Sequence, residues 1–230
     1  MNGEVLLNER LSRNWEQSEA AAKLEVSQPY LSLLEKGKRP VTEKIARRAV
    51  SVFKLPPSVL PFENAAEISQ TKANENTLSS NLSALGYPKF SHLKKSVKVN
   101  PALILITALI LDDLDSRIVE ALPWLIYRFA DMNWTMVFLH AKMHDAQNRL
   151  GFLLSLAFQL ALKNGDTEKQ KVLKELISDL EKSRLVREDS FRRNSLTETE
   201  KNWLKTNRTK DARYWKVLSN LSVENLDYKI

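Results

Sequence analysis

The chain has 230 residues, a hydrophobic fraction of 43%, five glycines and no cysteine. This composition is typical of a globular and largely helical protein, and it excludes disulfides and thiolate metal sites. The net charge of +7 suits a polyanionic partner, whereas the longest apolar run, residues 101–111, has only about half the length of a membrane span. Because no signal peptide is seen at its start, we expect a cytoplasmic protein that does not enter a membrane.

The first informative elements are two short helices, predicted over residues 17–24 and 28–36 and separated by a three-residue turn. Ser27 is a good N-cap for the second helix, Pro29 falls in its first turn, and Gly37 follows its end. The first helix has apolar residues at positions that face inward: Ala20, Ala21 and Leu24. A short helix, a tight turn and a capped second helix form a helix-turn-helix.

This segment resembles the helix-turn-helix of phage Cro/CI repressors and of the wider Xre family of bacterial regulators, over residues 3–60. Flanking helices predicted over 4–14 and 42–53 fit the same unit. The chain departs from the family at Glu25, where Gly is frequent, and a left-handed Glu there costs about 1 kcal/mol. The alternative is an ordinary helical cluster without a DNA partner. The matching residues are Gln17, Ala21, Leu24, Val26, Ser27, Gln28, Tyr30, Leu31, Leu34, Glu35, Gly37 and Pro40.

The resemblance implies a lambda-repressor-like DNA-binding domain over residues 1–61, with the second helix of the motif in the major groove. Gln28 is the best base reader, because a glutamine makes two hydrogen bonds to adenine. The resemblance also implies that an ion pair between Arg10 and Glu35 supports the recognition helix. The expected DNA-contacting residues are Gln17, Ser27, Gln28, Pro29, Tyr30, Ser32, Lys36, Lys38 and Arg39.

These contacts differ in kind. Gln17 starts the first helix of the motif and is expected to hold a phosphate, as are the three cations after the recognition helix. Tyr30 either contacts a thymine methyl group or a sugar, or packs on the domain surface. Leu33 occupies the position of a second base reader, so direct readout is thin and DNA shape carries more of the specificity.

Residues 1–60 contain ten Lys or Arg and seven Glu, a charge of +3. We therefore expect modest affinity for each copy, and a homodimer that reads a palindromic operator with half-sites about one helical turn apart.

The rest of the chain is predicted to be a linker followed by a helical domain. Three prolines close the first domain, and the polar stretch 62–99 is interpreted as a linker with one short helix over 77–85. Residues 100–230 are interpreted as an all-α domain of stacked antiparallel helices, with a HEAT-like pair over 117–141. Its predicted elements are 101–111, a helix starting at 115 that Pro123 kinks or restarts, 134–143, 146–163, 167–187, a helix after a capping box at 195–198, and 209–218.

Three groups in this domain have both a functional and a structural interpretation. His140 and His144, beside Asp145, have the spacing of a metal pair but lack a third ligand, so no metal is expected. The polar group 147–149 either binds a partner or effector, or bonds to neighbouring helix ends. The acidic run 112–115 either binds a cation or caps helix termini, and helix termini explain it better.

Two basic patches are either solvated helix faces or a second contact with nucleic acid, which would steepen the salt dependence of binding. The first comprises Lys89, His92, Lys94, Lys95 and Lys98. The second lies within residues 201–216 and comprises Lys201, Lys205, Arg208, Lys210, Arg213 and Lys216, interleaved with Trp203, Tyr214 and Trp215.

The sequence has no nucleophile–base–acid set, Gly-rich phosphate loop or metal cluster, so we expect neither an enzyme nor a cofactor. The predicted function is that of a nucleoid-associated transcriptional repressor, an antitoxin-like autoregulator whose helical domain binds a partner protein, the toxin. One alternative is a protein-interaction or inhibitor module in which DNA binding is secondary. A second alternative is a regulator that senses a small effector.

Overall fold

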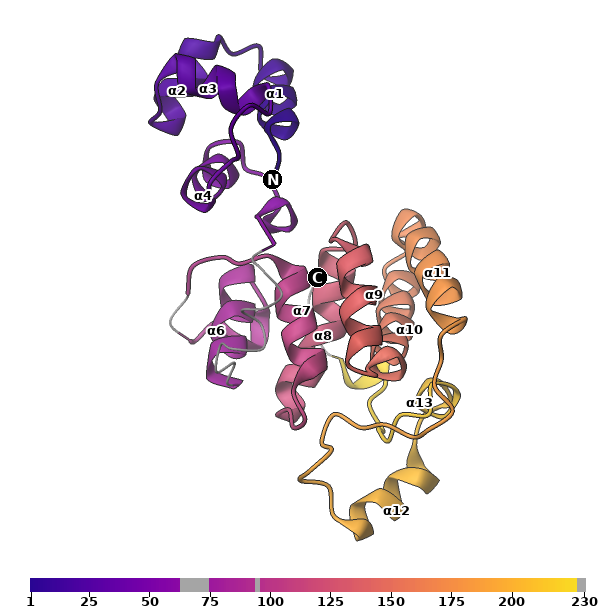
Figure 1. Ribbon diagram of the computed structural model, residues 1–230. Helices are drawn as coiled ribbons and strands as arrows, with labels where there is room; N and C mark the ends of the chain where they lie inside the picture. The colour runs from indigo at the N-terminus through magenta and orange to yellow at the C-terminus, as the bar shows by residue number, and fades with distance from the viewer. Residues whose placement is uncertain (63–74, 94–95, 227–230) are drawn as a thin grey trace. The chain divides into compact units, whose positions relative to one another are not determined.

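The computed structural model of the protein describes residues 1–62, 75–93 and 96–226 (Figure 1). Over these residues the chain is helical, without strands and with two isolated bridge pairs, so the predicted all-α class is confirmed. The chain divides into two compact units, residues 1–63 and 64–230.

The first unit is a small helical cluster around one apolar core. It contains α1 (Gly3–Ser12), α2 (Gln17–Leu24), α3 (Gln28–Glu35), α4 (Glu43–Val52) and the 3-10 turn η1 (Pro57–Val59). The predicted bounds agree for α2 and differ by one or two residues at one or both ends of the other three helices. Its core comprises Leu6, Ala20, Ala21, Leu24, Leu31, Leu34, Ile45, Ala49 and Phe53, so the inward face predicted for α2 is confirmed.

Two local features hold α3 in place. Glu25 adopts the expected left-handed conformation, with φ of 53°, and Arg48 fastens this turn by donating to the carbonyl oxygen of Leu24 at 3.0 Å. Helix α1 approaches the end of α3 so closely that a Cβ atom on Gly3 would lie 1.7 Å from the carbonyl oxygen of Leu34. Only glycine allows this approach without a shift of the backbone.

The second unit is a stack of helices in which α10 is central. In order it contains α6 (Glu75–Leu85), η2 (Pro88–Phe90), α7 (Pro101–Ile110), α8 (Ser116–Arg128), α9 (Trp134–Met143), α10 (Gln147–Lys163) and α11 (Thr167–Glu181). Helix α10 packs against α8, α9 and α11, which lie beside it in Figure 1. Because it is surrounded, α10 is buried along most of its length, as its nearly continuous apolar sequence predicts.

The chain then returns across α10 through α12 (Glu198–Asn207), α13 (Lys210–Tyr214) and η3 (Val223–Asn225). The indole of Trp215 lies directly on Gly151, where a Cβ atom would come within 2.3 Å of the ring. Its Nε1 donates to Ser155 Oγ at 2.9 Å. This return segment therefore closes one side of the helical stack.

The short helix predicted over 77–85 is present as α6, but the second half of the predicted linker 62–99 belongs to the second unit and does not connect two domains. Helix α6 packs against α7 and α8 and buries Leu78 and Leu82. Tyr87 is buried and lies 5.2 Å from Trp124, between ring centroids. The stretch resembled a linker because only one face of α6 is apolar. Residues 63–74 of the predicted linker lie outside the described residues.

Helix α8 continues through Pro123, so of the two outcomes predicted there the restart does not occur, because the buried apolar face of the helix holds it in the stack. Three further predictions in this unit are wrong in detail. Helix α11 ends at Glu181 rather than at residue 187, and the last predicted helix, 209–218, shrinks to α13. The capping box is formed by Thr197 and Glu200, two residues later than predicted, since Ser195 instead bonds to Asp113.

Candidate nucleic-acid interface

Helix α3 presents a short polar surface at its N-terminal end. Ser27 Oγ accepts a hydrogen bond from the Tyr30 amide at 3.4 Å, and Pro29 occupies the first turn, so the helix starts where the sequence predicts. Leu31 and Leu34 are buried in the core, which turns Gln28 and its neighbours outward. This is the arrangement that lets a helix reach base edges in a major groove.

The predicted contact residues do not all lie in the same environment. Ser27, Gln28 and Pro29 are exposed, and Ser32 is half-buried on the next turn. Tyr30 is half-buried and packs against the domain core, which favours the second of its two interpretations. Leu33 is 37% exposed, so the recognition helix carries an apolar side chain in solvent.

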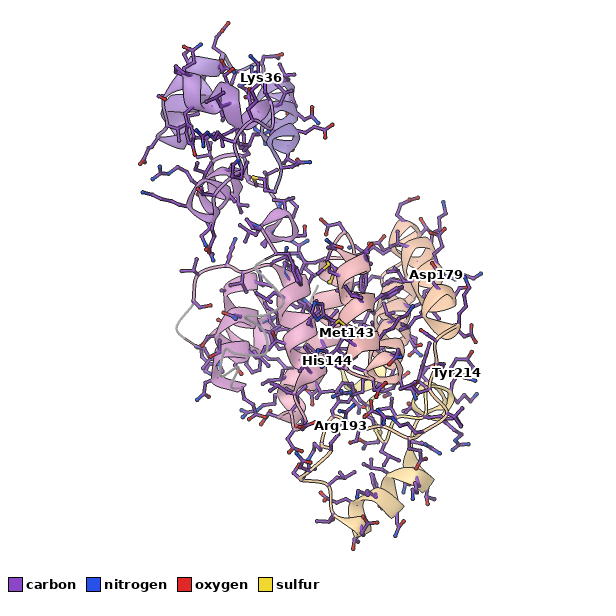
Figure 2. All side chains as sticks on the ribbon, in the orientation of Figure 1. Lys36, Met143, His144, Asp179, Arg193 and Tyr214 are labelled. Carbon is purple, nitrogen blue, oxygen red and sulfur yellow. The ribbon has the colours of Figure 1, made fainter. Side chains whose placement is uncertain are left out.

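A cluster of cations follows the recognition helix. Lys36, Lys38 and Arg39 are all exposed, and none forms an ion pair within the part of the chain that the structure describes. Figure 2 shows Lys36 on the surface of the first unit. Gly37, with φ of 67°, lets the chain turn between these cations. Such unpaired charges next to a recognition helix suit phosphate oxygens.

The recognition helix is supported by a buried network around Glu35. Its carboxylate accepts hydrogen bonds from Arg10 Nε at 2.7 Å, from Arg10 Nη2 at 3.1 Å and from Gln17 Nε2 at 2.9 Å. Arg10 Nη1 also donates to the carbonyl oxygen of Trp15 at 3.1 Å. The ion pair implied by the family resemblance is therefore present, and it connects α1, α2 and α3.

The network fixes the ionised form of Glu35. Burial of the carboxylate opposes ionisation, but the hydrogen bonds from Arg10 and Gln17 outweigh burial and hold the pKa of Glu35 below its ordinary value. The amide of Gln17 is thereby engaged inside the domain, with one N–H left for the phosphate predicted to bind there. Glu16 makes no side-chain cap bond, so the first backbone N–H groups of α2 remain for the same phosphate.

The sequence reasoning missed Arg48 as a supporting residue. Besides its bond to the end of α2, its guanidinium pairs with Glu25 in the turn. The arginine lies 23 positions downstream on α4, and no local pattern predicts that it reaches back to the turn.

The polar group at the start of α10 has the structural role. Asn148 accepts from the Leu185 amide at 2.9 Å and donates to the carbonyl oxygens of Leu185 and Arg187. Arg149 is fully buried, donates to the carbonyl oxygen of Leu111 at 3.1 Å and pairs with Asp189 at 3.1 Å. Burial lowers the pKa of Arg149 to about 10, although the carboxylate of Asp189 opposes that shift.

The acidic run 112–115 makes structural contacts, of which one is the predicted helix cap and the others are bonds to residues 193–195. Asp115 caps α8 through the Arg117 amide at 2.8 Å, and Asp113 accepts from the Ser195 amide at 3.0 Å. Asp112 pairs with Arg193, which Figure 2 labels in the return segment.

The histidine pair does not gain a third ligand. His140 is buried and stacks on His144 with 6.2 Å between ring centroids. Among the described residues, no group of three His, Cys, Asp or Glu side chains is arranged to hold a metal ion. Likewise, no described helix is both long and apolar enough to span a bilayer.

The basic patches are partly neutralised. Lys89 pairs with Glu120, Lys201 with Glu198, and Arg208 with Glu188. Lys94 and Lys95 lie outside the described residues. A second contact with nucleic acid stays a prediction.

Comparison with known families identifies a match for the first unit alone. A helix-turn-helix family model matches residues 6–60, which include α2, α3, α4 and every predicted DNA-contacting residue. No curated protein and no solved structure matches the chain.

Proposed function

We propose that the chain is a transcription regulator that represses its own promoter, because residues 6–60 form a helix-turn-helix domain of the Xre/Cro-CI type, which supports DNA binding. The observation that carries this proposal is the exposed end of α3, with Gln28 outward and three exposed cations just beyond the helix. In this arrangement Gln28 reads adenine, while Lys36, Lys38 and Arg39 bind the phosphate backbone.

The proposed operator is a palindrome bound by a homodimer. One copy of the first unit offers a single exposed glutamine and an apolar Leu33 on its recognition helix, which makes few base contacts. Two copies double those contacts, and the two-fold symmetry of a dimer requires half-sites related by the same symmetry. A footprint on one isolated half-site, protected by a monomer, would reject this part of the proposal.

We propose that the second unit binds a partner protein, as in an antitoxin that represses its own operon. The support is its stacked helices, with exposed apolar side chains at Leu139 and Met143 on α9 and Met143 labelled on the surface in Figure 2. The second candidate is effector sensing, favoured by a cavity of about 490 Å³ beside α12. Co-expression with the product of the adjoining gene separates the two, because an antitoxin co-purifies with that product.

A gel-shift titration on the DNA upstream of its own gene tests the DNA-binding proposal. Gln28→Ala is expected to remove discrimination at one A·T pair, which is worth about 1–3 kcal/mol. Arg39→Ala is expected to weaken binding to all sequences and to reduce the slope of log K against log salt by about 1. Lys171→Ala on α11 is the matched control, because this lysine is exposed and belongs to the second unit. If both Gln28→Ala and Arg39→Ala bind like the control, the recognition-helix account fails.

A further inference from the structure

The second unit contains an open cavity of about 490 Å³ that four separate segments line. They are the start of α8, residues 190–196, α12 and residues 218–221. Its size falls in the range of small-molecule sites in proteins, roughly 300–1,000 Å³. Most of its wall is apolar and comprises Leu114, Val119, Phe191, Leu196, Trp203, Leu204, Leu218 and Leu221.

Helix α12 borders this cavity without filling it. The helix has no buried residue, and its two large apolar side chains, Trp203 and Leu204, both line the cavity. Trp203 remains 53% exposed. In Figure 1 the helix stands away from α7 to α11. The indole is exposed to solvent at the cavity wall, so an apolar molecule that covers it binds with a favourable free energy.

A second cavity of about 330 Å³ adjoins the first, because Ser190, Arg192, Leu196 and Leu218 line both. Its wall carries four cations, each of them ion-paired with a carboxylate of the chain: Arg187, Arg192, Arg193 and Lys201. Arg192 is the cation shared by the two cavities. Its Nη1 donates to Glu200 at 3.2 Å and its Nε donates to Ser195 at 3.2 Å.

We propose that the two adjacent cavities bind a small anionic amphiphile, a free molecule with an apolar chain or ring and one carboxylate. The apolar part occupies the larger cavity against Trp203, and the carboxylate meets the guanidinium of Arg192. A carboxylate pairs with an arginine through two parallel hydrogen bonds, so the ligand takes the place of Glu200 on that guanidinium. Because Glu200 belongs to α12, binding changes how this helix is held.

Ligand binding is a property of the second unit. Its effect on DNA rests on the proposed function, since it requires that the chain binds an operator. The two parts are therefore tested separately.

The probes for binding are decanoate, decanol and inorganic phosphate, each titrated into the full-length protein by calorimetry and tryptophan fluorescence. Decanoate is expected to bind saturably, and decanol about tenfold more weakly, because it lacks the charged hydrogen bonds to Arg192. Phosphate alone is expected not to bind, because it leaves the apolar wall exposed. Trp203→Phe is expected to remove the fluorescence change and to retain the calorimetric signal.

Two variants locate the site, each with a matched control. Leu221→Trp fills the larger cavity and is expected to weaken decanoate binding at least tenfold, whereas Leu162→Trp, on an exposed position of α10, leaves it unchanged. Arg192→Gln is expected to abolish the preference for decanoate over decanol, whereas Lys171→Gln preserves it. The decanoate-to-decanol ratio of the unaltered protein tests the charge requirement even if a variant misfolds.

Absence of saturable decanoate binding, equal affinity for decanol, or unaltered binding by Leu221→Trp would each overturn the proposal. Gel shifts with and without decanoate then test the link to DNA. Decanoate binding by a protein that shifts no DNA would refute the proposed DNA-binding function and leave the ligand site standing.

Discussion

The network around Glu35 allows a quantitative test of how α3 is held. Glu35→Ala removes a carboxylate that accepts three hydrogen bonds, two of them from Arg10. Charge-assisted bonds contribute about 1.5–3 kcal/mol each, so their sum is an upper limit. The Arg10 side chain is 13% exposed and keeps its bond to the Trp15 carbonyl oxygen, which returns part of the loss. We expect the first unit to lose about 3–5 kcal/mol of stability, as when one partner of a buried pair is removed.

The double variant Arg10→Met/Glu35→Leu provides the second half of the test. Replacing both charges by apolar side chains of similar volume is often neutral or stabilising, so the double variant is expected within about 1 kcal/mol of the original protein. Hydrogen exchange of the full-length chain, resolved by peptide, measures opening of α1 to α4 and uses α7 to α10 as an internal reference. A double variant less stable than Glu35→Ala would refute the reasoning, because the charge left on Arg10 could then not account for the loss.

Three further outcomes follow from the structure. The pKa of Glu35 is lowered on folding, so its contribution to stability is fully present above the ordinary pKa of 4.5 and is lost as the pH falls through the folded value. Hydrogen exchange should show this loss of stability in the original protein and not in Glu35→Gln. Asp189→Asn leaves the buried Arg149 without its carboxylate and should destabilise the second unit by about 3–5 kcal/mol in urea titrations. Gly151→Ala drives a Cβ atom into the Trp215 ring and should cost about 1–3 kcal/mol, measured by thermal unfolding; an unchanged midpoint would contradict this packing.

The first unit could be predicted because its signals are local. The cap at Ser27, the proline after it and the glycine at 37 each act within a few residues, and together they place α3 to within one residue. The Arg10–Glu35 pair joins residues 25 positions apart. It was expected from the family resemblance, which supplies a contact that no local rule gives.

In the second unit, predictions from local sequence patterns failed where a residue far along the chain determines the local structure. Ser195 has the spacing of a capping box, but its hydroxyl donates a hydrogen bond to Asp113, and the capping box lies two residues later. Pro123 is predicted to kink the helix or to restart it, and the restart does not occur because the buried face of α8 carries the helix through this residue. The cavity beside α12 is assembled from four segments, so no single stretch of sequence indicates it.

The return segment has a consequence for how the chain is made. The hydrogen-bond partner of Asn148 is Leu185, 37 positions later in the chain, and that of Ser155 is Trp215, 60 positions later. A ribosome releases the chain from its N-terminus, so α10 emerges well before the groups that cover it. Until those groups arrive, the charge of Arg149 lacks Asp189 and the surface of Gly151 is uncovered. The nascent helical stack therefore exposes surface that chaperones and proteases recognise until the return segment is synthesised. A chain that stalls before residue 185 keeps this surface exposed and is expected to be degraded.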